Sequence, residues 1–335
     1  MKYYMKHRKK LKTALRILPF CLAIGTCGCG NVAEDNPDPR PTSPVEIVSP
    51  VEIQPGADAT APSSSPTGNA STNATPSPAP TAVPTPEPTP APTPDPGPEP
   101  TNVFESESWW LSYGEPGAQT QPRGNAKQSD LSWYGSYYLG SPDEKVVYLT
   151  FDCGYENGNT ELILSALANH NAKATFFMTG QFLETAPDLV KRILEEGHEA
   201  GNHTWNHPDM SAFTDMADFQ KELDDVANLF YEITGTEIGP YYRPPEGRCS
   251  EENLRWAKEL GYHTIFWALA HVDWYQDNQP DPQESIDRLT SRVSPGAVVL
   301  LHNTSQTNGT IIDDLMTKWE ELGYTFRPLS DLTGP

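Results

Sequence analysis

Residues 146–152 read Val-Val-Tyr-Leu-Thr-Phe-Asp, six strand-forming residues followed by a carboxylate. Short apolar runs of this kind, rich in β-branched and aromatic residues, are typical of a strand that is buried on both faces. A charged side chain directly after such a strand is expected at the edge of the sheet, because an unpaired charge is costly to bury. The sequence therefore predicts a central, buried strand with Asp152 at its carboxyl end.

Strand-like and helix-like segments alternate along the rest of the C-terminal half. The apolar runs predict strands at residues 174–178, 264–268, 297–301 and 324–327. Helical spacing of apolar residues predicts helices at 160–169, 187–196, 215–234, 250–260 and 311–322. This alternation predicts an α/β fold, in which helices cover a mostly parallel sheet that is either open or closed into a barrel.

The region before this half has a different composition. Of the 34 prolines in the chain, 20 lie between Pro37 and Pro100, among many Ser, Thr and Ala residues. Such a segment cannot bury enough apolar surface to offset its ordering entropy, and its Pro-Thr-Pro repeats favour an extended spacer. We therefore predict a disordered linker at residues 30–102 and a folded domain at residues 103–335.

The first 29 residues have the pattern of an export signal. A basic head precedes an apolar stretch at residues 17–24, which is too short to span a bilayer, since a membrane helix needs about 20 residues. The following Gly-Thr-Cys-Gly-Cys resembles a bacterial lipoprotein signal. Cys29 is favoured as the lipidated residue because Gly28 precedes it, and Cys27 is the alternative. Ordinary secretory cleavage or an uncleaved anchor stays open, and each of these places the domain outside the membrane.

Charge and cysteine usage narrow the classes of partner. The formal net charge is −22, and from residue 30 onward 16 basic and 45 acidic residues give 16 − 45 = −29. A surface this acidic argues against nucleic acid and favours a neutral or weakly charged ligand such as a sugar. Only Cys153 and Cys249 lie in the predicted domain, as one disulfide or as two thiols, so no disulfide framework is expected.

Polar residues stand where several predicted strands end. They are Asp152, Asn202-His203, Arg243, Asp273 and His302. The carboxyl ends of parallel strands meet at one edge of a sheet or one end of a barrel, where active sites of barrel enzymes lie. His203 and His207 are four residues apart, so on a helical turn they would share a face and could hold one metal ion. Each feature alone also fits a structural role, such as a helix cap, a rigid loop or a surface histidine.

Taken in order, these residues resemble the motifs of a known family. The run from Leu149 to Glu156, the His203/His207 pair, Arg243-Pro-Pro245, Asp273-Trp274 and Leu301-His302 follow the order of the five motifs of NodB-type polysaccharide deacetylases, carbohydrate esterase family four. The resemblance covers about residues 145–327. It implies a distorted (β/α) barrel that hydrolyses N-acetyl, and sometimes O-acetyl, groups on sugars.

The resemblance also implies roles for single residues. His203 and His207 would bind a divalent metal, usually zinc, that activates water and polarises the acetyl carbonyl. Asp152 would be the general base, and Arg243 would orient it and keep it ionised.

On the leaving-group side, His302 would be the general acid that protonates the amine. Asp273 would fix its tautomer and raise its pKa. Leu301 and Trp274 would form the walls of the acetyl pocket.

One residue departs from the family pattern. The family usually has a second Asp directly after the base, as a third metal ligand, and this chain has Cys153 there. A thiolate can bind zinc at about 2.3 Å, which would give a Cys-His-His site. The alternative is that Cys153 is a neutral spectator and the metal is bound weakly.

The same departure points to one branch of the family. Deacetylases that act on N-acetylmuramic acid to form muramic δ-lactam in spore cortex, during sporulation, also lack the second Asp. They are similar to this chain at Gly154–Gly158, Gly201–His203 and Trp133–Gly140, and in the turn after His302. We therefore expect a muramoyl substrate. Glu246 follows Pro245 in the pocket where a basic residue could meet the lactyl carboxylate, and Arg248 is the expected substitute.

Three other hypotheses stay open at this point. They are deacetylation of N-acetylglucosamine, O-acetyl esterase activity on a glycan such as xylan, and a catalytically silent wall-binding lipoprotein. The expected partners are peptidoglycan strands and, through a lipid anchor, the membrane surface, and we expect a monomer. His271 is a further candidate for the pocket because it lies close to Asp273.

Overall fold

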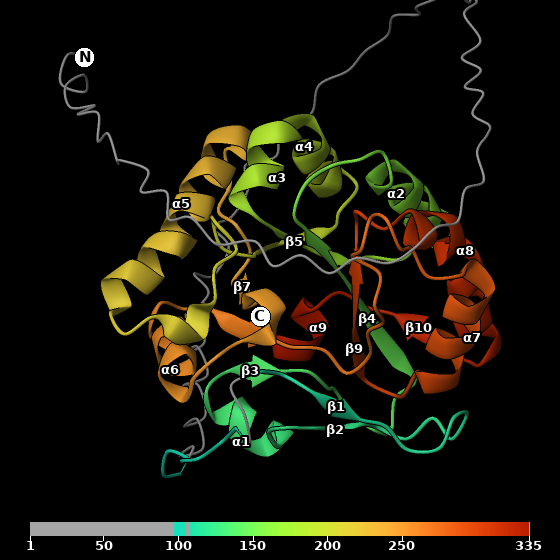
Figure 1. Ribbon diagram of the computed structural model, residues 1–335, viewed down its shortest axis with the longest axis horizontal. Helices are drawn as coiled ribbons and strands as arrows, with labels where there is room; N and C mark the ends of the chain where they lie inside the picture. Colours follow the sequence, from blue (N-terminus) through green and yellow to red (C-terminus); the bar gives the residue numbers. More distant parts are fainter. Residues whose placement is uncertain (1–96, 105–107, 335) are drawn as a thin grey trace, which may run out of the picture. The chain divides into compact units, whose positions relative to one another are not determined.

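The computed structural model describes residues 97–104 and 108–334 (Figure 1). The predicted export signal and nearly all of the predicted linker lie outside these residues. Within them, no helix combines the length and apolarity that crossing a bilayer requires.

A curled, eight-stranded sheet forms the centre of the domain. Its strands are β3 (Ser136–Tyr137), β4 (Val146–Cys153), β5 (Thr175–Met178), β6 (Glu199–Asn202), β7 (Tyr241–Tyr242), β8 (His263–Ile265), β9 (Ala297–His302) and β10 (Thr325–Phe326). All their pairings are parallel, in the order β10-β4-β5-β6-β7-β8-β3, and β9 also pairs with β4. The predicted α/β class and mostly parallel sheet are confirmed.

The sheet curls because β4 is paired along both edges. One edge is bonded to β9, and the other to β10 near Val146 and to β5 near Cys153. Beyond β8 the chain runs alongside β9: Ala268 N–H donates to Val298 O at 2.8 Å, and Leu300 N–H donates to Leu269 O at 2.9 Å. These bonds join the segment after β8 to β9, which is paired with β4 at the centre of the sheet. The strands therefore form a distorted barrel, as the family resemblance implied.

Helices cover the outside of this sheet (Figure 1). They are α2 (Thr160–Asn169), α3 (Gly180–Thr185), α4 (Pro187–Glu195), α5 (Met216–Thr234), α6 (Glu251–Glu259), α7 (Pro282–Arg292) and α8 (Gln306–Glu321). Upstream of the barrel lie the hairpin β1 (Leu111–Ser112) with β2 (Arg123–Gly124) and the short helix α1 (Gln128–Trp133), and α9 (Ser330–Thr333) is near the end of the chain.

Local signals account for most helix boundaries. Asp215 caps α5 by accepting a hydrogen bond from Ala217 N–H, and Gly235 ends it in the left-handed conformation, at φ 74°. Helix α7 was not predicted from the sequence, although Asp281 caps it and Pro282 occupies its first position. Strands were expected to end at Asn202 and Arg243, and these are β6 and β7, but strands of four and two residues carry too little periodicity for their ranges to be predicted.

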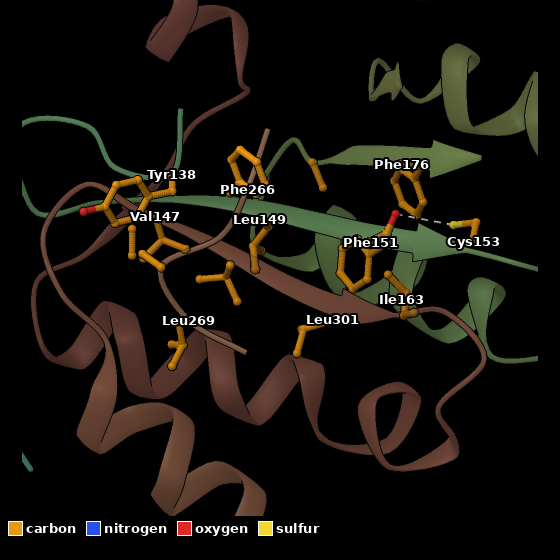
Figure 2. Packing of buried hydrophobic residues seen from close by; sticks show 14 of the residues in the cluster. Tyr138, Val147, Leu149, Phe151, Cys153, Ile163, Phe176, Phe266, Leu269 and Leu301 are labelled. Carbon is orange, nitrogen blue, oxygen red and sulfur yellow. Dashed lines mark hydrogen bonds between the residues drawn. The ribbon is translucent and has the colours of Figure 1, made fainter. Parts of the chain in front are cut away.

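The core lies between β4 and the helices around it (Figure 2). Every residue of β4 is buried, as expected for a strand covered on both faces. Phe151 and Phe176, on adjacent strands, stack with ring centroids 5.2 Å apart, and Ile163 of α2 belongs to the same cluster. Strand β4 is therefore buried and paired along both edges, and Asp152 lies near its end.

Contacts with the domain begin before the predicted boundary at residue 102. The Glu99 carboxylate accepts hydrogen bonds from the Arg255 guanidinium at 2.8 Å and from the Tyr134 hydroxyl at 3.0 Å. Trp109 stacks on Phe266 with centroids 4.5 Å apart. The last residues of the predicted linker therefore lie against the folded domain.

Two neighbouring aromatic residues of α5 test the assignment of the core. Phe230 is 1% exposed and Tyr231 is 51% exposed. We expect Phe230→Ala to lower the free energy of unfolding by about 3–5 kcal/mol, because it removes a buried ring and leaves a cavity. The control Tyr231→Ala should cost about 0.5 kcal/mol or less. Equal midpoint shifts in urea unfolding curves would contradict this description of the core.

Candidate active site

Two neighbouring strands bring a carboxylate and an imidazole together. Asp152 of β4 and His302 of β9 are register partners across the parallel pair. Adjacent strands lie about 4.8 Å apart, so both side chains leave the same end of the barrel. Three other residues predicted at strand ends, His203, Arg243 and Asp273, lie at this end too and contact one of these two side chains.

Asp152 is buried and stays ionised. Its Oδ1 accepts a hydrogen bond from Arg243 Nη1 at 2.7 Å, and its Oδ2 lies 3.4 Å from His203 Nε2. Burial alone would raise the pKa of Asp152, but the guanidinium of Arg243 and the hydrogen bond it donates outweigh burial, so the pKa lies below its ordinary value. The carboxylate can therefore accept a proton at neutral pH.

Arg243 is fully buried, and its surroundings fix its position. Its Nε donates to the Ile265 carbonyl at 3.0 Å, and the guanidinium lies over the Phe177 ring, 4.1 Å from the centroid. Phe177 in turn needs a glycine beneath it, since a Cβ at Gly201 would come within 2.6 Å of its ring. The glycine of the Gly201-Asn202-His203 run thus makes room for the ring on which Arg243 rests.

His203 and His207 face each other, but not on a helix. The segment between them is a loop in which Thr204 and His207 have φ angles of 67° and 55°. The prediction of a helical turn here is wrong, because such positive φ values are incompatible with a right-handed helix. The two rings still pack edge to face, with centroids 4.9 Å apart.

The donor atoms of this pair fit a divalent cation. His203 Nδ1 donates to the Arg243 carbonyl at 2.9 Å, which leaves the Nε2 lone pair directed at Asp152 Oδ2. Burial, opposed by Asp152 and reinforced by His207, lowers the pKa of His203 to about 4, so the ring is neutral at neutral pH. Two acceptors then face each other with no proton between them, an arrangement that a cation beside them would relieve.

Cys153 is not part of this group of donors. It is buried in the core with Phe176 and Ile163, and its thiol lies 3.7 Å from the Phe151 carbonyl, which it faces as a weak donor (Figure 2). Successive strand residues point to opposite faces, so Cys153 points away from the side on which Asp152 lies. Among the described residues, no three His, Cys, Asp or Glu side chains are spaced to hold a metal ion. The burial and direction of the Cys153 side chain therefore favour the spectator alternative over the Cys-His-His site.

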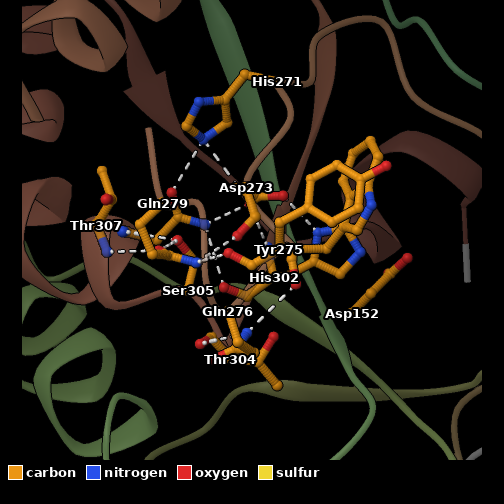
Figure 3. A network of polar contacts seen from close by, with 12 residues as sticks. Asp152, His271, Asp273, Tyr275, Gln276, Gln279, His302, Thr304, Ser305 and Thr307 are labelled. Atoms are coloured by element: carbon orange, nitrogen blue, oxygen red, sulfur yellow. Dashed lines mark hydrogen bonds and ion pairs between the residues drawn. The ribbon is translucent and has the colours of Figure 1, made fainter. Parts of the chain in front are cut away.

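His302 is paired with a second buried carboxylate (Figure 3). Asp273 Oδ1 accepts from His302 Nδ1 at 2.7 Å, and Oδ2 accepts from the His302 backbone N–H at 2.9 Å. Burial alone would lower the pKa of His302, but the charge and hydrogen bond of Asp273 raise it above its ordinary value. His302 thus keeps a proton on Nδ1 and presents Nε2 toward the opening.

A cleft of about 1130 Å³ opens over these residues. Asp152, His203, His207 and His302 line it together with the aromatic side chains of Trp109, Tyr155, Trp205, Trp267, Trp274 and Tyr275. The predicted wall residue Trp274 lies here, 45% exposed, with its ring centroid 5.8 Å from that of His302. His271 lines the cleft as well.

Three predicted pocket residues lie elsewhere. Leu301 is in the core, and Leu300 lines the cleft instead, because alternate residues of β9 face opposite sides and His302 shares the side of Leu300 (Figure 2). Pro245 is buried beneath the cleft wall, in a short turn where Glu246, at φ 56°, reaches the cleft. Arg248 is paired with Asp209 at 2.7 Å and does not line the cleft.

Sequence reasoning missed some lining residues. Gln181 and Glu184 come from α3, which follows β5, so the strand-end argument applied to β5 would have found them. Arg288 comes from α7, and no motif marks it. Among the described residues that line the cleft, it is the single Lys or Arg.

Comparison with known proteins agrees with this geometry. Residues 140–265 match the polysaccharide deacetylase family. The chain is 44% identical over 215 residues to the peptidoglycan-N-acetylmuramic acid deacetylase PdaA of Bacillus subtilis, covering 63% of this chain and 81% of PdaA. It is 34% identical over 181 residues to a peptidoglycan-N-acetylglucosamine deacetylase of Bacillus cereus, covering 52% and 62%. The solved structure of Bacillus subtilis PdaA, a family 4 carbohydrate esterase, superposes with a TM-score of 0.63 at 40% identity, covering 68% of this chain and 97% of that one.

The position of Cys153 predicts its reactivity. Both described cysteines are free and buried, and burial raises the pKa of each thiol. We expect neither thiol to react with an aromatic disulfide reagent in the native protein and both to react after unfolding. Cys153→Ala should leave zinc affinity, measured by competition with a chelating dye, unchanged. A large loss of affinity in this variant would restore Cys153 as a ligand.

Proposed function

Because this chain belongs to the polysaccharide deacetylases of carbohydrate esterase family four, we propose that it hydrolyses the acetamide of N-acetylmuramic acid in peptidoglycan strands. The observation that carries the proposal is that two pairs of side chains lie next to each other, one suited to accept a proton and one suited to donate it. Asp152 with Arg243 supplies a proton acceptor, and His302 with Asp273 supplies a proton donor, on adjacent strands at one end of the barrel.

The residues divide the reaction between them. Asp152 takes a proton from the attacking water, and Arg243 holds the carboxylate in place and ionised. As the new carbon–oxygen bond forms and the carbon–nitrogen bond breaks, His302 gives the proton on Nε2 to the departing amine. The products are acetic acid and a free amino sugar, and the proton taken up by Asp152 replaces the one that His302 gave, so atoms and charge balance over the cycle. A divalent metal held by His203 and His207, which we propose to be zinc, would supply Lewis acidity toward the acetyl carbonyl and the water.

The lining of the cleft supports a glycan substrate. Six aromatic side chains provide flat apolar surfaces of the kind that pack against sugar rings, and Trp274 lies beside His302. Asp152, Glu184 and Glu246 are the acidic residues of the lining. A strongly anionic substrate is therefore disfavoured, whereas a glycan with isolated carboxylates is compatible.

Arg288 supports muramic acid over glucosamine. It is exposed on α7 and forms no ion pair within the part of the chain that the structure describes. N-acetylmuramic acid differs from N-acetylglucosamine by a lactyl ether, which carries a free carboxylate once its peptide is removed. A guanidinium in the cleft can pair with that carboxylate, a role that the sequence had assigned to Arg248. The free amine formed beside the lactyl carboxyl can then attack it and close a lactam, with loss of water.

The N-terminal predictions complete the proposal. An exported, lipid-anchored chain with lipidation at Cys29, or a secreted one, would carry the domain on the Pro-rich linker to the cell wall. Peptidoglycan would be its partner there, and the enzyme would act as a monomer. The branch of the family that this chain resembles makes the δ-lactam during sporulation, so a role in sporulation is part of the proposal.

Mass spectrometry of digested strands tests the reaction. Purified protein with added zinc is incubated with peptide-stripped peptidoglycan. We expect acetyl-to-hydrogen mass losses at muramic residues, and a fall of about 10²-fold or more in rate for Asp152→Asn, which removes the proton acceptor without changing its shape. Acetyl loss at glucosamine residues alone, or from acetylated xylan alone, would replace this substrate by one of the alternatives. Binding without acetate release would favour the silent wall-binding lipoprotein.

A second variant tests the muramic specificity. We expect Arg288→Gln to raise KM for peptide-stripped peptidoglycan by about 10-fold, because a charge-assisted pair contributes about 1.5–3 kcal/mol. Hydrolysis of N-acetylglucosamine oligomers, which have no carboxylate, should be unaffected. Arg292→Gln is the control, since Arg292 is on the same helix and bonds to the Gly114 carbonyl outside the cleft. Equal effects of Arg288→Gln on both substrates would refute carboxylate recognition.

A further inference from the structure

Two helices of this domain begin with the same pattern, Ser-x-x-Asn, and use it differently. Ser250 caps α6, and the Asn253 side chain returns to it, accepting from Ser250 N–H at 3.0 Å to complete a capping box. Ser305 caps α8 in the same way, accepting from Asn308 N–H at 3.2 Å. The Asn308 side chain does not return to its cap. It reaches into the site instead.

The contacts of Asn308 assign its amide orientation. Its Nδ2 donates to Asp273 Oδ2 at 2.5 Å and to the His302 carbonyl at 3.1 Å. Both partners can only accept, so the nitrogen must face them. Its Oδ1 then faces His271 Nε2 at 3.0 Å, and that nitrogen must carry a hydrogen. These hydrogen bonds form a continuous network from His271 through Asn308 and Asp273 to His302.

This hydrogen-bond network is buried, and Gln279, which is not one of its members, holds the elements that carry it together. Asn308 and Asp273 are fully buried, and His271 is 5% exposed. Gln279 ties the Asp273 loop to the start of α8: its Nε2 donates to the Asp273 carbonyl at 3.1 Å, and its Oε1 accepts from the Ser305 hydroxyl at 2.8 Å. The loop and the helix start therefore form one unit around Asp273.

We infer that Asn308 is a positioning residue for the general acid: it holds the Asp273 carboxylate in the rotation that keeps the Nδ1 hydrogen of His302 engaged and its Nε2 directed at the leaving group. Asp273 Oδ2 receives one bond from the His302 backbone and one from Asn308. Without the second, both remaining bonds to the carboxylate come from His302 itself, and the carboxylate turns more easily about its last torsion, which is a soft one. His271 is the donor that keeps Asn308 from flipping. The kinetic part of this inference rests on the proposed function.

Each charged group close to His302 already has a hydrogen-bonded partner. Asp152 on β4 is paired with Arg243, which follows β7, and Asp273 is the carboxylate that bonds to His302 directly. Asn308 is uncharged, so its contribution is geometric, and it is expected to appear in the tautomer and hydrogen bonding of His302.

Nuclear magnetic resonance of histidine-labelled protein tests this without requiring activity. In the parent protein we expect His302 to be the Nδ1–H tautomer, with an Nδ1 proton that is shifted far downfield and protected from exchange; His302→Gln identifies its signals. In Asn308→Leu, which keeps the side-chain size and removes the amide, we expect a mixture of tautomers and loss of the protected proton. Asp273→Asn is the positive control, because it removes the acceptor and should also lower the pKa of His302.

Asn253→Leu is the matched control. It removes the same residue at the same helix position from α6, and should cost stability while leaving the His302 signals as in the parent protein. If Asn308→Leu does not fold, His271→Leu and His271→Gln take its place. Leucine leaves Asn308 Oδ1 without a donor and should loosen the His302 proton, whereas glutamine can still donate and should preserve it. Unchanged His302 tautomer and proton protection in Asn308→Leu, or in His271→Leu, would overturn the inference.

Kinetics give the second readout. We expect Asn308→Leu to lower kcat on peptide-stripped peptidoglycan by about 10- to 100-fold with little change in KM, as is typical of residues that orient a reacting group. A rise in KM with unchanged kcat would overturn the positioning role. If the parent protein releases no acetate, the proposed function fails while the resonance experiment still decides the role of Asn308.

Discussion

The buried ion pair between Arg243 and Asp152 is the constraint on which the rest of the site depends. Removing two charges from water is costly, and the cost is offset only when geometry is good and the remaining hydrogen-bonding groups are satisfied. Arg243 meets this requirement through the carbonyls of Ile265 and Phe266 and the face of Phe177. Five strands thus contribute to one contact: β4 carries Asp152, β5 carries Phe177, β6 provides the glycine beneath that ring, the chain after β7 carries Arg243, and the end of β8 supplies carbonyls.

The second pair, His302 with Asp273, also contains a buried carboxylate whose burial must be offset, but other elements of the fold hold it. Asp273 lies on an irregular loop, and its carboxylate is held both by His302 at the end of β9 and by Asn308 in the first turn of α8. The sheet therefore holds the Asp152–Arg243 pair, whereas the His302–Asp273 pair is held by β9 together with helix α8. The two carboxylates have different partners: Asp152 pairs with a permanent cation, which keeps it ionised, and Asp273 pairs with an imidazole, whose protonated form it stabilises. In the proposed function they take opposite tasks.

The same geometry explains how the chain departs from the family pattern without losing the site. Cys153 replaces a ligating carboxylate, and its side chain occupies the core, where a thiol is tolerated as a small apolar group. The two imidazoles and Asp152 remain on the side that lines the cleft. A carboxylate at this position that pointed into the same core would be unpaired among apolar groups. The cysteine avoids this cost, and β4 extends to Cys153.

Sequence by itself determined the α/β class, the central strand, most helix boundaries and the polar residues at strand ends. Each of these depends on short-range periodicity, on capping or on the rule that parallel strands share their carboxyl ends. Tertiary structure alone decided the rest. Which of Leu300 and Leu301 meets the cleft depends on which face of β9 is inward, and Arg288 and Asn308 enter the site from helices that no motif connects to it. Local pattern specifies which element forms, whereas the side chains that meet across the barrel are set by how the elements pack, and packing couples residues far apart in the chain.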